Sequence, residues 1–560
     1  MHIKYIKLLL AIFIIFFTTP LYSKKDTKDQ FNSKNFSNYF SAVIAYDNNK
    51  NSEALKFFNL SKNLTNKHKS FLKQHIYSLI IDGKVGPAII KLKSNLKREN
   101  SIFFESYFLL ALDSINKKNF DKSDEYLEKL SKFKDEGVIE NIIYESLKSY
   151  TYLFENKEII PTNFGTLSYV SQALQNCYLD TAQTPIFFKN LINNDAIDSA
   201  RYKFFYINYL IKNNNLKLLK EIANEIDPLN RTLLTYQTKK WIQKKEFKKI
   251  SSIFSCQKES DILSEFFYII ANLYSSQDDL EKSNFYLNIS FFLNPKFKYN
   301  LSLSSENYYY NKNYEQVKRI LKNFNKNEEV YYWYKIKKKT NIISEKYSEE
   351  KAFGYINLEL ENLEDLSSKV LFDMANISKN FKKYKIAIDY YNKLLLNKKL
   401  RPSSYAEILY RRGGSHERLG DFKKSDKDLQ EALQIRPDDA YILNYLAYSW
   451  LERNYKIDEA ILMLKRAYEL KKNDPFILDS VGWGYFLIDD FVNAEIFLKL
   501  AIQYMPDDPT VNDHYGDVLW KLDRKIEAKY YWQSVLNFKE TTDDIKKNIR
   551  IKILNGIKKI

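Results

Sequence analysis

The chain has 560 residues, a formal net charge of +17 and an aromatic content of 16%. Glycine (12) and proline (11) are rare for this length, which argues against a β-rich protein, a phosphate-binding glycine loop and long flexible linkers. This composition favours nearly continuous helix joined by short turns. The positive charge does not indicate a nucleic-acid-binding protein, because Lys is spread along the chain among Asn and Ile and forms no block of like charges.

The segment 1–23 has the pattern of a Sec-type signal peptide. Lys4 and Lys7 form a positive start, Leu8–Phe17 is an apolar run of ten residues, and the pattern ends at Ser23. Since a bilayer span needs about 20 apolar residues, we expect cleavage near Ser23 and an exported, periplasmic chain. An uncleaved anchor is the alternative. No cysteine lies near Ser23, so a lipid anchor is not expected. Export also argues against a nucleic-acid partner.

Segments 24–137 and 261–366 have the spacing of degenerate helical hairpins. Ala42 and Ala54 are twelve residues apart, and Ala88 follows Ala54 by 34 residues. Ala271 and Ser283 repeat the twelve-residue step. Between them, segment 138–260 keeps a helical apolar period but loses this register, so we expect hairpins of irregular length. The stretch 325–366 is the least regular and is compatible with a longer helix.

The two cysteines, Cys177 and Cys256, are 79 residues apart. An exported protein can hold a disulfide. However, packed helices lie about 8–10 Å apart, whereas bridged Cα atoms lie within about 7 Å. The sequence therefore favours two buried free thiols over a bridge, and two distant cysteines do not predict a metal site.

Segment 367–542 contains the clearest pattern, a unit repeated four times. The units are Ala406–Asp439, Ala440–Asp474, Pro475–Asp508 and Pro509 to about Thr542. A small residue recurs near each start at intervals of 34, 35 and 34 residues: Gly413, Ala447, Gly482 and Gly516. A second small residue follows, and then a large one: Leu429, Leu464, Leu498 and Trp532. We expect the small residues where two antiparallel helices cross, with the large ones filling the space beside them.

This period and order of residues resemble the tetratricopeptide repeat (TPR), a helix-turn-helix unit. Residues 444–536 are similar to the C-terminal block of exported bacterial TPR proteins of about this length. The resemblance implies an all-α fold, an α-solenoid in which helical hairpins stack into a right-handed superhelix. It also implies a protein-interaction role in the cell envelope, and it supplies no catalytic residues.

Segment 543–560 begins with a helix-start signal at Thr541–Asp544. Because repeat arrays need a polar element at their ends, we expect a capping helix here. The alternative is a basic amphipathic helix on an anionic membrane, although its apolar residues are mostly Ile and include no Trp or Phe.

Four positions of the first helix in each TPR unit are expected to face the concave surface. The sixteen side chains at these positions include five carboxylates and seven aromatic rings, and none of them is Lys or Arg. We expect this groove to bind a protein or peptide segment that carries Lys or Arg and an apolar side chain. The absence of Lys argues against the carboxylate clamp of chaperone-type members. The alternative is that the acids cap helices and the aromatic rings fill the core. The candidate binding residues are Tyr410, Glu417, Asn444, Tyr448, Asp479, Trp483, Asp513, Asp517 and Trp520.

No catalytic motif is present. The sequence has no nucleotide-binding glycine loop, no His-Glu-x-x-His site and no Gly-x-Ser-x-Gly elbow, so we predict no enzyme activity, no cofactor and no metal. The leading hypothesis is an envelope scaffold or adaptor of unknown oligomeric state. The alternatives are a membrane- or cell-wall-associated structural protein that uses its basic surface, and a transferase-like enzyme or its regulatory subunit.

Overall fold

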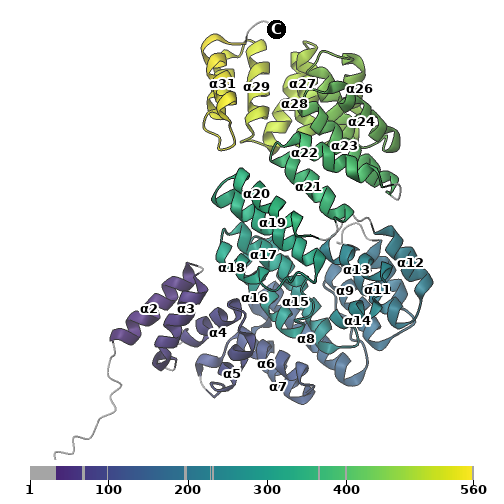
Figure 1. Ribbon diagram of the computed structural model, residues 1–560. Coiled ribbons are helices and arrows are strands. Elements are labelled where there is room, and N and C mark those ends of the chain that lie inside the picture. The colour runs from purple at the N-terminus through teal and green to yellow at the C-terminus, as the bar shows by residue number, and fades with distance from the viewer. Residues whose placement is uncertain are drawn as a thin grey trace, which may run out of the picture. The chain divides into compact units, whose positions relative to one another are not determined.

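The computed structural model describes residues 33–48, 50–65, 68, 70–97, 99–193, 199–226, 229, 232–363, 366–397 and 400–557. The predicted signal peptide and its cleavage near Ser23 lie outside these residues. The described residues contain no β-strand, and consecutive helices pair as hairpins that pack side by side (Figure 1). The predicted all-α solenoid of helical hairpins is therefore confirmed.

The helices form two compact units. The first unit comprises residues 1–216 and 246–323 and the second comprises residues 217–245 and 324–560. The irregular stretch 138–260 is shared, because α12 (Leu216–Glu225) and α13 (Leu233–Gln243) belong to the second unit and their chain neighbours to the first.

The first unit consists of short hairpins with three interspersed 3-10 turns. Its α-helices are α2 (Ser33–Asp47), α3 (Asn51–Leu60), α4 (Phe71–Ile81), α5 (Val85–Lys93), α6 (Phe104–Asn116), α7 (Phe120–Leu130), α8 (Val138–Asn156), α9 (Thr166–Leu179), α10 (Thr184–Ile192), α11 (Ser199–Lys212), α14 (Phe247–Ile253), α15 (Glu259–Ser276), α16 (Leu280–Leu293), α17 (Asn300–Tyr310) and α18 (Tyr314–Leu321). The 3-10 turns are η1 (Lys62–Leu64), η2 (Glu99–Ser101) and η3 (Ser131–Glu136). Helix α16 packs against α4 and α5, so the end of this unit meets its beginning.

The second unit ends in the regular repeats. Its helices are α12 (Leu216–Glu225), α13 (Leu233–Gln243), α19 (Glu329–Lys346), α20 (Glu349–Glu361), α21 (Ser368–Asn380), α22 (Tyr384–Leu395), α23 (Pro402–Arg418), α24 (Phe422–Ile435), α25 (Ala440–Leu451), α26 (Ile457–Leu470), α27 (Pro475–Leu487), α28 (Phe491–Tyr504), α29 (Pro509–Lys521), α30 (Lys525–Val535) and α31 (Asp543–Asn555). The last helix, α31, packs on α30.

Local sequence signals fix the ends of the regular helices. The side chains of Asp439, Asp474 and Asp508 accept hydrogen bonds from backbone N–H groups in the first turns of α25, α27 and α29. Each of these caps contributes about 1 kcal/mol to helix stability. Pro475 and Pro509 occupy positions in the first turn of their helices. A backbone N–H group there has no acceptor within the helix, so proline costs no hydrogen bond.

The helices of one repeat cross where the sequence places its small residues. A Cβ atom added at Gly516 would lie 2.4 Å from Nε1 of Trp532, and one at Gly482 would lie 2.6 Å from Cγ of Leu498. Both large side chains are fully buried. The predicted pairing of small and large residues is therefore confirmed at these two crossings.

The expectation of free thiols is wrong, because Cys177 and Cys256 form a disulfide with their Cα atoms 5.8 Å apart. The expectation used the distance between packed helix axes. Cys177 lies in the last turn of α9 and Cys256 lies in the loop between α14 and α15. A loop can approach a helix end more closely than a second helix axis can.

Candidate functional site

A groove crosses the first helices of the regular repeats. It encloses about 420 Å³. Four of the predicted binding residues, Tyr410, Asn444, Tyr448 and Asp479, lie in its wall. The complete lining contains no Lys or Arg and consists of Tyr410, Tyr441, Asn444, Tyr445, Tyr448, Phe476, Asp479, Ser480, Met505, Asp508, Thr510 and Val511.

Asn444 of α25 supplies a hydrogen-bonding group to this wall. Its Oδ1 atom is buried and has no hydrogen-bond donor among the described residues. Buried polar atoms in folded proteins are usually paired. A carboxamide both donates and accepts, so it matches the N–H and C=O groups of a peptide backbone.

Tyrosine rings form most of the groove surface. The rings of Tyr410 and Tyr445 meet edge to face with centroids 5.9 Å apart. The pKa of Tyr448 lies far above its usual value. Burial is the largest cause, and the negative charges of Glu452 and Asp479 add to it. The Tyr448 hydroxyl therefore stays protonated at neutral pH and can donate a hydrogen bond.

The predicted site residue Glu417 lies outside the groove lining. Its Oε2 atom accepts a hydrogen bond of 3.0 Å from the hydroxyl of Tyr445, and it also lies 3.4 Å from Nε of Arg418. This carboxylate therefore positions a groove tyrosine and is not itself open to a ligand within the groove.

Asp479, Trp483 and His514 form a cluster between α27 and α29. Nδ1 of His514 lies 2.9 Å from Oδ1 of Asp479, and the Trp483 ring stacks on the His514 ring at a centroid distance of 4.0 Å. The Trp483 Nε1 donates a hydrogen bond of 2.7 Å to Glu452. The candidate binding residue Trp483 is thus half-buried and held by contacts within the array.

Three further candidate binding residues, Asp513, Asp517 and Trp520 of α29, contact the C-terminal segment of the chain. Nζ of Lys552 lies 2.6 Å from Asp513 and 2.7 Å from Asp517, and Asp517 is 4% exposed. A Cβ atom added at Gly556 would clash with the Trp520 ring, at 2.1 Å. Asp513 and Asp517 bind Lys552 of α31, and Trp520 packs against Gly556. These three residues therefore hold the C-terminal segment.

The charges of this cluster alter its protonation. Burial alone lowers the pKa of His514, but the carboxylates Asp479, Asp513 and Asp517 together raise that pKa above its usual value. Burial and the neighbouring Asp513 raise the pKa of Asp517 to about 6, although Lys552 opposes the change. The Asp517 carboxyl therefore loses its proton near pH 6, and His514 keeps its proton to a higher pH than an ordinary histidine does.

The sequence reasoning missed several groove residues. Tyr445 and Ser480 each follow a predicted concave position, and Asp508 was recognisable only as the end of a repeat. Met505 and Val511 lie around the junction of α28 and α29. The repeat period does not distinguish a groove residue from a core residue at the next position of the same helix, so only the helix packing identifies these residues.

The described residues offer no sign of other chemistry. Within the described ranges, no group of three or more His, Cys, Asp or Glu side chains is arranged to hold a metal ion. In the same part of the chain, none of the helices combines the length and apolar character needed to cross a membrane.

Comparison with known proteins agrees with the repeat pattern. Residues 406–439 match the sequence model of the tetratricopeptide repeat. A TPR repeat-containing protein of Pseudomonas aeruginosa is 34% identical over 110 residues, which are 20% of this chain and 18% of that protein. The match thus spans about a fifth of the relative's length.

Solved TPR proteins share partial likenesses. One from Parabacteroides merdae is 16% identical, with 40% of this chain and 85% of that chain covered and a TM-score of 0.31. A thermophilic TPR protein of Thermus thermophilus is 17% identical, with 34% and 100% covered and a TM-score of 0.30. The fold assignment rests on the helix pairing described above. TPR arrays generally bind protein partners on their concave surface. The chain therefore contains a tetratricopeptide repeat at residues 406–439, within a series of hairpins that repeat its small-and-large crossing.

Proposed function

We propose that this chain is an exported scaffold of the cell envelope, and that the groove lined by α23, α25, α27 and α29 binds a segment of a partner protein. The observation that carries the proposal is the composition of the groove wall. It combines aromatic rings, an unpaired carboxamide oxygen on Asn444, and the carboxylates Asp479 and Asp508, without any basic residue.

The exposed aromatic rings define what the partner segment brings. Phe476 is 62% exposed and Tyr441 is 44% exposed at the groove. Such rings commonly anchor a partner's apolar side chain in protein interfaces. The acidic character of the groove favours Lys or Arg beside that apolar side chain. The segment is therefore expected to carry one basic and one apolar or aromatic residue.

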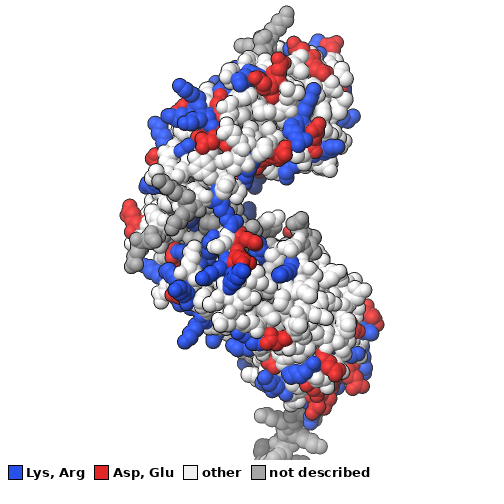
Figure 2. All heavy atoms as spheres, turned by 90° about the vertical axis from the view of Figure 1, so that its right-hand side faces the viewer, with Lys and Arg blue, Asp and Glu red and all other residues white. Residues whose placement is uncertain are grey.

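The export part of the proposal is supported by the signal-like segment 1–23 and by the Cys177–Cys256 disulfide. Structural disulfides form and persist in oxidising compartments and are rare in the bacterial cytosol. The second candidate, attachment to membrane or cell wall through a basic surface, has weaker support. On the face drawn in Figure 2, Lys and Arg lie intermixed with Asp and Glu.

A photo-crosslinking experiment in the producing cells tests the binding proposal. A benzophenone residue replaces Phe476 in the groove, and in a matched strain it replaces Tyr530 of α30, which is 65% exposed and lies outside the groove. We expect a defined cross-linked adduct from position 476 that is absent from position 530. Identical adduct patterns at the two positions would contradict a groove-specific partner.

Fractionation of the same cells tests export separately. Release of the chain by osmotic shock, together with mass spectrometry of its N-terminus, is expected to give a periplasmic protein that starts after Ser23. Recovery of the full-length chain in the cytosol would contradict export but would leave the groove proposal standing.

A further inference from the structure

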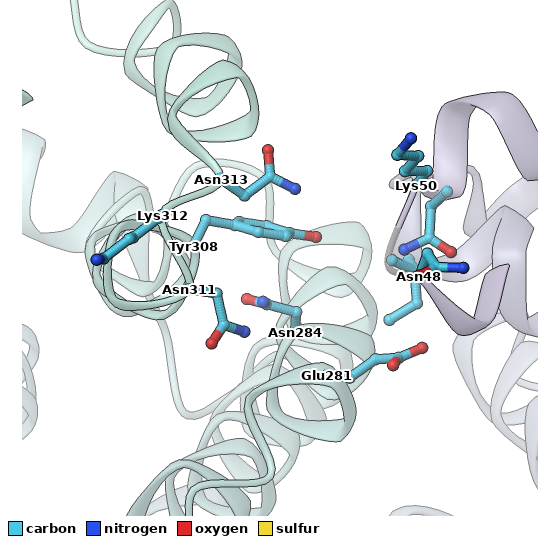
Figure 3. A pocket seen from close by; sticks show the side chains of 10 residues that line it. Asn48, Lys50, Glu281, Asn284, Tyr308, Asn311, Lys312 and Asn313 are labelled. Carbon is cyan, nitrogen blue, oxygen red and sulfur yellow. The ribbon is translucent and has the colours of Figure 1, made fainter. Parts of the chain in front are cut away.

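A polar pocket lies within the first unit, far in sequence from the groove. It opens where the α2–α3 connection faces α16, α17 and the α17–α18 connection, and it encloses about 470 Å³ (Figure 3). Five of its ten lining side chains are asparagines, and they come from both sides of the pocket. Figure 3 shows Asn284, Tyr308 and Asn313 on one side and Asn48 and Lys50 on the other.

Long-range contacts hold the two sides of this pocket together. The rings of Tyr77 on α4 and Phe285 on α16 stack with centroids 4.3 Å apart. Nδ2 of Asn288 donates a hydrogen bond of 3.0 Å to the carbonyl of Ile81, and Nη1 of Arg319 donates one of 2.6 Å to Asp82. The pocket is therefore a built feature of the packing between these helices.

Two acceptors at the pocket wall are unpaired. Asn51 is only 6% exposed, and its Oδ1 atom has no donor among the residues that the structure describes. The same holds for the Oε1 atom of Glu281. Because buried acceptors are normally satisfied, a ligand that brings hydrogen-bond donors would complete this wall.

The lining chemistry selects the class of ligand. Carboxamides offer donors and acceptors together, as do the hydroxyl groups of a sugar. Ile81 is the one aliphatic side chain in the lining, so the pocket is unsuited to a lipid. The two lysines of the lining, Lys50 and Lys312, are both exposed, so no dense cationic cluster is present to bind a phosphate. The volume is in the range of small-molecule sites, about 300–1,000 Å³.

We propose that this pocket binds a small uncharged carbohydrate of one or two sugar units. Its hydroxyl groups donate to Asn51 and Glu281, and one face of the sugar ring lies against the Tyr308 ring. The site is independent of the peptide groove, because it lies in the other unit and shares no residue with it.

Saturation-transfer NMR and calorimetry on the purified full chain test this proposal. The probes are N,N′-diacetylchitobiose, maltose and trehalose, with free lysine and triglycine as zwitterionic comparisons, each up to about 10 mM, where weak binding is still measurable. We expect at least one disaccharide to bind. Glu281→Gln and Asn51→Leu should each weaken that binding about tenfold, equivalent to about 1.4 kcal/mol.

A matched control separates binding from folding. Glu128→Gln on α7 removes an exposed carboxylate of the same unit outside the pocket and should leave affinity unchanged. Circular dichroism checks that every variant keeps its helix content, and the two pocket variants guard against failure of either one to fold. Binding of none of the three sugars, binding of the zwitterions alone, or wild-type affinity in both pocket variants would overturn the proposal.

Discussion

Lys552 of α31 donates hydrogen bonds to both carboxylate oxygens of Asp517 on α29, at 2.8 and 2.7 Å. The same ammonium group donates a bond of 2.6 Å to Asp513. A basic side chain of the chain itself therefore occupies the acidic positions that the sequence assigned to a partner. The last helix closes the end of the array, and the groove that remains begins at α23 and ends at the first turn of α29.

Lys552→Met should loosen this last helix. Removing the ammonium group of a largely buried ion pair leaves the carboxylates of Asp513 and Asp517 without this cation, which costs about 3 kcal/mol. Hydrogen–deuterium exchange of peptides spanning α31 measures the change, and we expect much faster exchange there. Lys547→Met on the exposed side of the same helix is the control and should exchange as the wild type does. Protection of α31 that is equal in both variants would contradict the role of Lys552.

Reduction of the Cys177–Cys256 disulfide should destabilise the first unit. The bridge closes a loop of 79 residues, for which the chain-entropy relation gives about 4.5 kcal/mol. A reductant should lower the denaturation midpoint of the wild type. The Cys177→Ser/Cys256→Ser double variant should start from the lower midpoint and not respond to the reductant. A wild-type midpoint that is unchanged by full reduction would exclude a stabilising bridge.

The His514–Asp479 pair should make the contact between α27 and α29 depend on pH. Because the folded state raises the pKa of His514, the pair contributes stability below the pKa of an unfolded histidine, about 6.5. This stability is lost as the pH rises through the folded-state pKa. Asp517 acts in the same direction, since its pKa is raised to about 6. Its contribution is present below the unfolded value, about 3.9, and is lost as the pH passes about 6.

Tryptophan fluorescence during urea unfolding measures this dependence, because Trp483 stacks on His514. The wild type should be more stable than His514→Gln at acidic pH, and the difference should shrink as the pH rises past neutrality. A difference that instead grows with rising pH would show that the neutral histidine, and not the ion pair, stabilises this contact.

The repeat pattern of the sequence predicted the fold because each small residue packs against a large residue of the same hairpin. Gly516 and Trp532 lie on the two helices of one hairpin, so their spacing of one helix and one turn is visible in the chain. The positions of Tyr410, Asn444, Tyr448 and Asp479 in the groove follow from the same register.

Contacts that depend on how distant helices fold together could not be predicted in this way. The reach of Lys552 to Asp517 requires the path of the chain after α30. The disulfide required knowledge that Cys256 lies in a loop and not on a helix axis. The polar pocket joins Asn51 to Glu281, which belong to different repeats with no shared register.

Selection of binding peptides from a random library tests the central claim, that the groove of the regular repeats binds a basic and apolar segment. Peptides enriched on the wild-type chain should combine Lys or Arg with an apolar or aromatic residue. Phe476→Ala and Asn444→Leu should each weaken the best peptide about tenfold, equivalent to about 1.4 kcal/mol, whereas Tyr530→Ala should leave its affinity unchanged. Enrichment of acidic peptides, or equal affinity for all three variants, would contradict the claim.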